Sequence, residues 1–81
     1  MSVTYYVALP FIETGEGLAA GPAQECPNER SAIWRAEAMS RDPMHAGALA
    51  FKRSGDPNQG NFGDATVLKK FGLVPDRLEK Y

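Results

Sequence analysis

The sequence has few of the residues that cross-link small proteins or hold metals in them. Among its 81 residues there is one cysteine, Cys26, and one histidine, His45. A single cysteine excludes a disulfide within the chain, and the two residues together fall short of the four nitrogen or sulfur ligands of a structural zinc site. A chain of this length buries only about 60–65% of its unfolded surface. Self-association is the remaining route to added stability for such a small core.

The sequence also lacks an excess of charge and any long apolar run. Lysine and arginine number 9 against 10 aspartate and glutamate residues, a net charge of −1. No apolar stretch approaches the ~20 residues that span a membrane, and residues 1–6 lack the pattern of a signal peptide. We therefore expect a cytoplasmic protein that binds no cofactor and no membrane. The balanced charge makes nucleic acid a less favoured partner than another protein.

The N-terminal third predicts a β-hairpin. Apolar and smaller or polar residues alternate over residues 3–11, which is typical of a half-buried strand. Pro10 cannot donate a backbone hydrogen bond, so we expect it near a strand end or on an edge strand. A glycine-containing turn over residues 14–17 leads to a returning strand at residues 18–26. The pair Gly21-Pro22 predicts that this second strand is short or bulged.

The middle of the chain predicts an amphipathic helix over residues 29–41. Asn28 is a suitable N-cap, and Asp42-Pro43 ends the pattern. The expected buried stripe follows the three-four spacing of a helix face and consists of Ala32, Ile33, Ala36, Met39 and Ser40.

The C-terminal half predicts two further strands, at residues 45–53 and 65–71, joined by a long turn over residues 54–64. The element order predicts an α+β fold of ββαββ type, a four-stranded antiparallel sheet with the helix packed on one face. Residues 1–75 form the expected single domain and residues 76–81 a C-terminal tail.

The sheet face away from the helix is the first candidate interaction surface. If the larger side chains face the helix, this face carries small apolar and aromatic residues: Tyr6, Ala46, Ala48 and Ala50. An uncovered apolar face favours a homodimer. The alternative is that alanines are tolerated on a solvated face.

Trp34 is the second candidate. It lies beside Ala38 at the predicted margin of the buried helix stripe. Either its ring closes over the edge of the sheet, or it serves as an aromatic anchor for a partner protein.

Motifs for catalysis or metal binding are weak, so no catalytic, cofactor or metal residue is assigned. His45 has no nucleophile at a catalytic spacing, and Cys26 stands near the helix start without a supporting base. The loop over residues 56–64 offers oxygen ligands but fails the EF-hand pattern, since glycine stands at its fifth position and Val67 replaces the terminal glutamate. The same loop lacks the lysine of a phosphate-binding P-loop.

Three hypotheses about function follow. The favoured one is a non-enzymatic protein that acts by self-association or by binding another protein. An alternative is a small nucleic-acid-associated regulator that uses a basic hairpin, and another is an enzyme whose site is shared across a dimer interface. The basic hairpin would use Lys52, Arg53, Lys69 and Lys70.

Several segments resemble small stand-alone bacterial proteins that carry no assigned function; these are residues 47–51, 54–57, 62–65, 71–72 and 74–75. The hairpin led by tyrosines, followed by a helix with an alanine-rich stretch over residues 32–39, is similar to antitoxin domains of the HicB type. The chain lacks that family's proline-glycine-cysteine segment and its following DNA-binding segment. The resemblance therefore implies no activity and no site.

Overall fold

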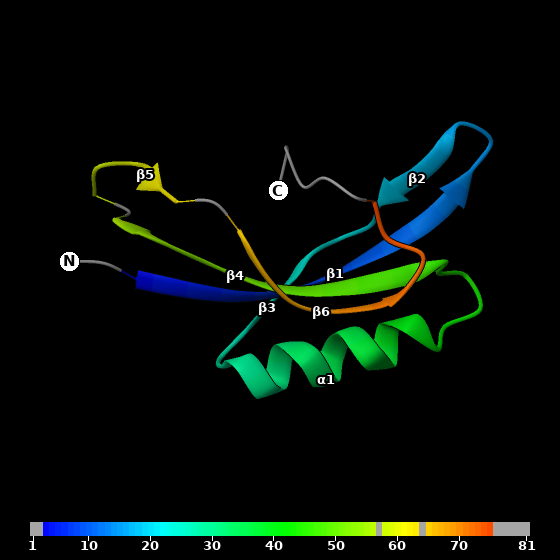
Figure 1. Cartoon of the computed structure of the whole chain (residues 1–81), viewed down its shortest axis with the longest axis horizontal. Helices are drawn as coiled ribbons and strands as arrows, with labels where there is room; N and C mark the ends of the chain where they lie inside the picture. The colour runs from blue at the N-terminus through cyan, green and yellow to red at the C-terminus, as the bar shows by residue number, and fades with distance from the viewer. Residues whose placement is uncertain (1–2, 57, 64, 76–81) are drawn as a thin grey trace.

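The computed structural model describes residues 3–56, 58–63 and 65–75. One helix packs on one side of an antiparallel sheet (Figure 1). The α+β class, the single helix and the antiparallel sheet are as the sequence predicts. The elements in chain order are β1 (Val3–Thr14), β2 (Gly17–Ala20), β3 (Gln24–Cys26), α1 (Glu29–Ser40), β4 (Gly47–Asp56), β5 (Asn61–Phe62) and β6 (Thr66–Gly72).

The sheet has six strands rather than four, because each outer row is divided into two short strands. The long strands β1 and β4 pair at the centre, from Val3 opposite Gly55 to Phe11 opposite Gly47. On the outer side of β1 lie β2 and β3, and on the outer side of β4 lie β5 and β6. The prediction of two hairpins joined by a helix is thus approximately right.

Pro10 explains where the first outer row is interrupted. It lies within the central strand β1 and is buried, so the prediction of a strand-end or edge position is wrong. Its carbonyl accepts a hydrogen bond of 2.8 Å from the backbone N–H of Gly21, in the break between β2 and β3. The N–H and C=O of a residue in an antiparallel strand point to the same neighbouring strand. The side of Pro10 that lacks an N–H donor therefore faces the break between β2 and β3, where no ladder hydrogen bond is needed from it.

The two faces of the sheet are covered differently from the prediction. The alanines Ala8, Ala48 and Ala50 are fully buried against α1. The large side chains of the same strands, led by Phe11 and Leu49, form a second buried cluster on the other face. The prediction that the larger side chains face the helix is therefore wrong.

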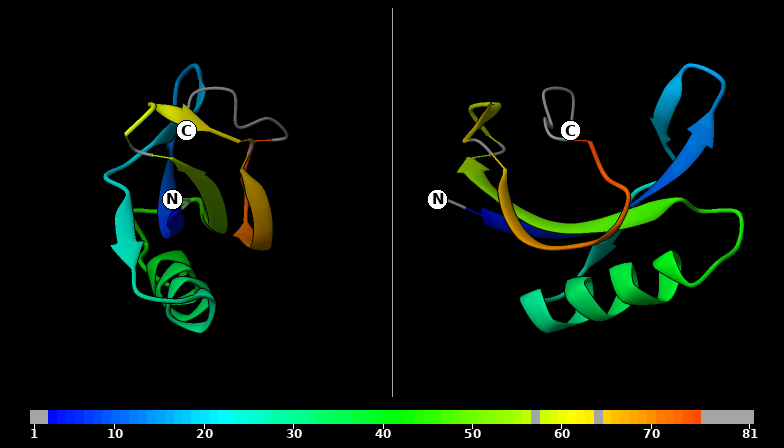
Figure 2. Two further views of the ribbon diagram at one scale, coloured as in Figure 1. Left: turned by 90° about the vertical axis from the view of Figure 1, so that its left-hand side faces the viewer. Right: turned by 45° about the vertical axis from the view of Figure 1, so that its right-hand side comes forward.

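Close packing of the helix is the physical reason for this arrangement. The buried residues of α1 are Ala32 and Ala36, which meet sheet alanines. With no atoms beyond Cβ on either side, the helix lies close against the sheet. The sheet curves away from the helix (Figure 2). On the face opposite α1, the large side chains pack with partly buried residues of other segments, Val74 among them.

The limits of α1 follow the local sequence. The Asn28 side chain accepts a hydrogen bond of 2.8 Å from the Ser31 N–H, which confirms the predicted N-cap. The helix ends at Ser40, one residue before the predicted end. Beyond it, the His45 Nδ1 lies 2.8 Å from the carbonyl oxygen of Met39 and covers the last turn.

Candidate interaction surface on the helix

Trp34 lies on the outer side of α1, away from the sheet. It is two positions from both buried alanines, Ala32 and Ala36, which places it about 160° around the helix from each of them. Its exposed fraction is 70%. The ring therefore does not close over the edge of the sheet, and a position at the margin of the buried stripe is wrong.

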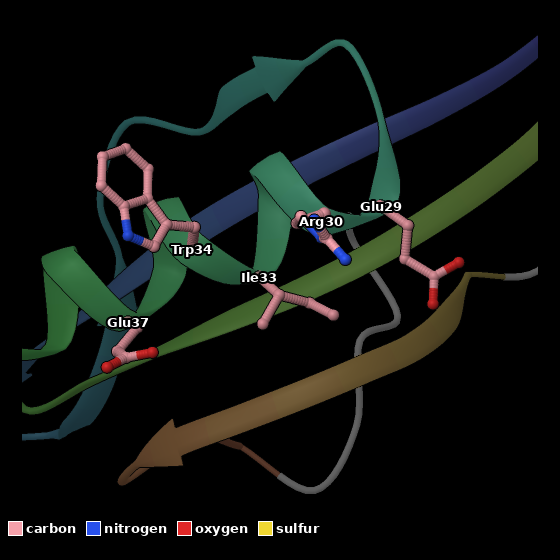
Figure 3. Close-up of a pocket in the computed structure, with 5 residues that line it drawn as sticks. All are labelled: Glu29, Arg30, Ile33, Trp34 and Glu37. Carbon is pink, nitrogen blue, oxygen red and sulfur yellow. The ribbon is translucent and has the colours of Figure 1, made fainter.

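A shallow open pocket lies beside this ring. Its volume is about 450 Å³, and its lining residues all come from α1: Glu29, Arg30, Ile33, Trp34 and Glu37. Figure 3 shows Ile33 directed toward β6 and Trp34, the next residue along the helix, directed away from β6. Among the described elements, α1 contacts only strands of the sheet, so this outer face has no cover from them.

The charges on this face are of both signs. Glu37 accepts a hydrogen bond of 2.6 Å from the Arg41 guanidinium one helical turn away. Arg30 is exposed and forms no ion pair within the described residues. The side chains of the Arg41–Glu37 pair are 75% and 41% exposed, so both remain accessible to a partner.

The alanine surface predicted from the sequence is not available to a partner. Ala48 and Ala50 are fully buried under α1, and Tyr6 packs partly buried against the same cluster. Ala46 precedes β4 and is half-buried, with its N–H donating to the Phe11 carbonyl. The prediction of an uncovered sheet face is wrong because the helix covers the small residues and the curved sheet buries the large ones.

The residues of the basic hairpin are divided between the two faces of the sheet. Successive side chains of a strand point to opposite faces, so the adjacent pairs in β4 and β6 are each split. The Lys69 ammonium lies 5.4 Å over the Phe71 ring. The Arg53 Nε donates a hydrogen bond of 2.9 Å to the Gly63 carbonyl. The structure thus does not gather the four residues into one patch: Lys52, Arg53, Lys69 and Lys70.

Neither Cys26 nor His45 lies in an arrangement for nucleophilic catalysis. Cys26 is buried in the cluster under α1, and this burial raises the pKa of its thiol above the ordinary 9.0. A raised pKa lowers the reactive thiolate fraction near neutral pH. The His45 ring bonds the backbone of Met39, and its Nδ1 is 4.0 Å from the carboxylate of Asp42.

The loop after β4 forms ordinary turn hydrogen bonds where it is described. The Asp56 side chain accepts from the Asn58 N–H at 2.9 Å, and its carbonyl accepts from the Gln59 N–H. Pro57 and Asp64 of the loop, and the tail at residues 76–81, lie outside the described residues. No group of three or more potential metal-ligating side chains occurs in the described part of the chain.

Sequence reasoning named Trp34 but misplaced it. The signal that could have placed it was the pair of alanines two positions to either side, because a stripe centred on Ala32 and Ala36 leaves Trp34 on the opposite side of the helix.

No helix in the described residues is long and apolar enough to cross a membrane. Comparison with models of protein families, with curated proteins and with solved structures finds no match to the chain.

Proposed function

We propose that the protein acts by self-association through the outer face of α1, with Trp34 as the anchor of the interface. The observation that carries this proposal is the 70% exposed tryptophan beside an open pocket. Tryptophan is among the residue types most enriched at interface positions whose loss weakens binding strongly. A large ring left in water on the outer face of α1 contributes little to the fold, so a binding role accounts for it better.

The neighbouring residues support the same role. Ile33 adds a half-buried apolar side chain to the lining of the pocket, whose other lining residues besides Trp34 are charged. An apolar centre with a polar rim is the usual anatomy of a protein interface. The sheet-face homodimer expected from the sequence is replaced here by a dimer through the helix.

The size of the face sets the expected affinity. A helix of 12 residues is about 18 Å long, so its outer face is smaller than the roughly 800 Å² per partner of a standard interface. We therefore expect a dissociation constant in the micromolar range. Sedimentation of the purified chain from about 10 µM to about 1 mM covers this range.

The decisive variant is Trp34→Ala. Because the side chain is largely exposed, we expect an unchanged circular dichroism spectrum together with association weakened at least about tenfold. A matched control is Leu73→Ala, which removes a 58% exposed apolar side chain beyond the end of β6 and should associate like the wild type. Equal sedimentation of wild type and Trp34→Ala across the series would overturn the proposal.

A further inference from the structure

Resting on the proposed function, we infer that the second copy packs its own α1 antiparallel against the first, with Arg30 of each copy facing Glu37 of the other. The two-fold axis passes between Ile33 and Trp34. Each tryptophan ring then lies against the partner subunit's Ile33, flanked by two Arg–Glu pairs. The interface is thus specified by charge as well as by the aromatic anchor.

The spacing of the two charges makes the stripe self-complementary. Arg30 and Glu37 are seven positions apart, close to two helical turns, so they lie on the same side of α1 at either end of the apolar pair. A two-fold axis perpendicular to the helix reverses the order of residues in the facing copy. The positive end of one stripe therefore meets the negative end of the other, twice.

Other registers bring unfavourable contacts. If one helix slides by one turn along the other, Arg30 lies opposite the partner subunit's Arg41. Trp34 then lies opposite the partner subunit's Glu37. A parallel arrangement about an axis along the helices places each charge opposite its own copy. Like charges at an interface disfavour such arrangements, so the sequence of α1 selects the antiparallel register.

The side chains concerned are available for this contact. Arg30 is exposed and has no ion pair among the described residues, so it can turn toward a partner without breaking one. Glu37 accepts from Arg41 through Oε1, which leaves its second carboxylate oxygen for the partner subunit's Arg30.

The test exchanges charges between two single variants. Arg30→Glu alone, and Glu37→Arg alone, should each associate about tenfold more weakly than the wild type, because both contacts become repulsive. When these two variants are mixed in equal amounts, both contacts become Arg–Glu again. We therefore expect a 1:1 heterodimer with near wild-type affinity, measured by sedimentation of one fluorescently labelled variant.

Two controls separate the possible failures. Arg41→Ala removes the intrachain pair of Glu37 and should leave association unchanged within about twofold. If both charge variants associate like the wild type while Trp34→Ala does not, the register is wrong and the proposed self-association stands. If the mixture fails to associate better than either variant alone, the register is also wrong. If Trp34→Ala associates like the wild type, both proposals fail.

Discussion

At the scale of single residues, Gly47 has the closest surroundings of the described glycines. A Cβ built at this position would lie 2.1 Å from the carbonyl oxygen of Leu73 and 2.6 Å from that of Phe71. Both atoms belong to backbone that cannot rotate away, since Leu73 also donates its N–H to the Ala46 carbonyl. The start of β4 can therefore approach the end of β6 only because residue 47 has no side chain.

We expect Gly47→Ala to lower the free energy of unfolding by about 2 kcal/mol or more, the cost of forcing extra volume into a closed contact. Urea unfolding followed by circular dichroism measures this. Gly15→Ala is the matched control, because a Cβ there meets no atom within 4 Å. Equal destabilisation by the two substitutions would show that the close strand contact is not a constraint on the fold.

At the scale of elements, α1 is held by small residues rather than by a broad apolar stripe. Its fully buried residues are Ala32 and Ala36, and they meet the sheet at Ala48 and Ala50. Ile33 and Met39 pack at the sides of this contact. The short distance between helix and sheet therefore depends on every central residue of the contact remaining small.

Ala36→Leu should consequently destabilise the protein by about 1–3 kcal/mol, because the helix must move outward to admit a larger side chain. The same chemical change at the exposed Ala19 of β2 should alter the free energy of unfolding by less than about 0.5 kcal/mol. Thermal unfolding of both variants gives the comparison. A tolerated Ala36→Leu would mean that the helix–sheet distance is adjustable.

At the scale of the whole molecule, the domain is elongated and thin, with extents of 40 × 26 × 17 Å. The helix lies on the convex side of the curved sheet (Figure 2). The sheet separates two small apolar clusters, one under α1 and one on the opposite face. Each cluster alone is too small to stabilise a domain independently, so we expect the two to unfold together. Association through α1 would add stability to this single cooperative unit.

This leads to a concentration dependence of unfolding. A dimer of folded chains is favoured at higher protein concentration, so the thermal midpoint of the wild type should rise by a few degrees across a hundredfold increase in concentration. The midpoint of Trp34→Ala should rise by less over the same range, because its association is weaker. Differential scanning fluorimetry or calorimetry measures both. A wild-type midpoint independent of concentration would contradict stabilisation by the proposed dimer.

Most element positions could be read from the sequence because they depend on local chemistry, but β5 (Asn61–Phe62) lies where the sequence predicts a turn. The alternation in β1, the Asn28 cap and the helix spacing up to Ser40 each act over a few residues. The stop in the second strand at Gly21-Pro22 has the same local origin. These features required no knowledge of what packs against them.

Which face of the sheet the helix covers was decided only by the tertiary structure. A period-two pattern divides a strand into two sets of side chains, but it is the same pattern whichever set faces the helix. The choice rests on how closely α1 can approach and on how far the sheet curves, and both depend on contacts between distant residues such as Ala36 and Ala48. Reversing that one assignment buried the predicted alanine surface, because Ala48 and Ala50 lie under α1 and have no exposed area.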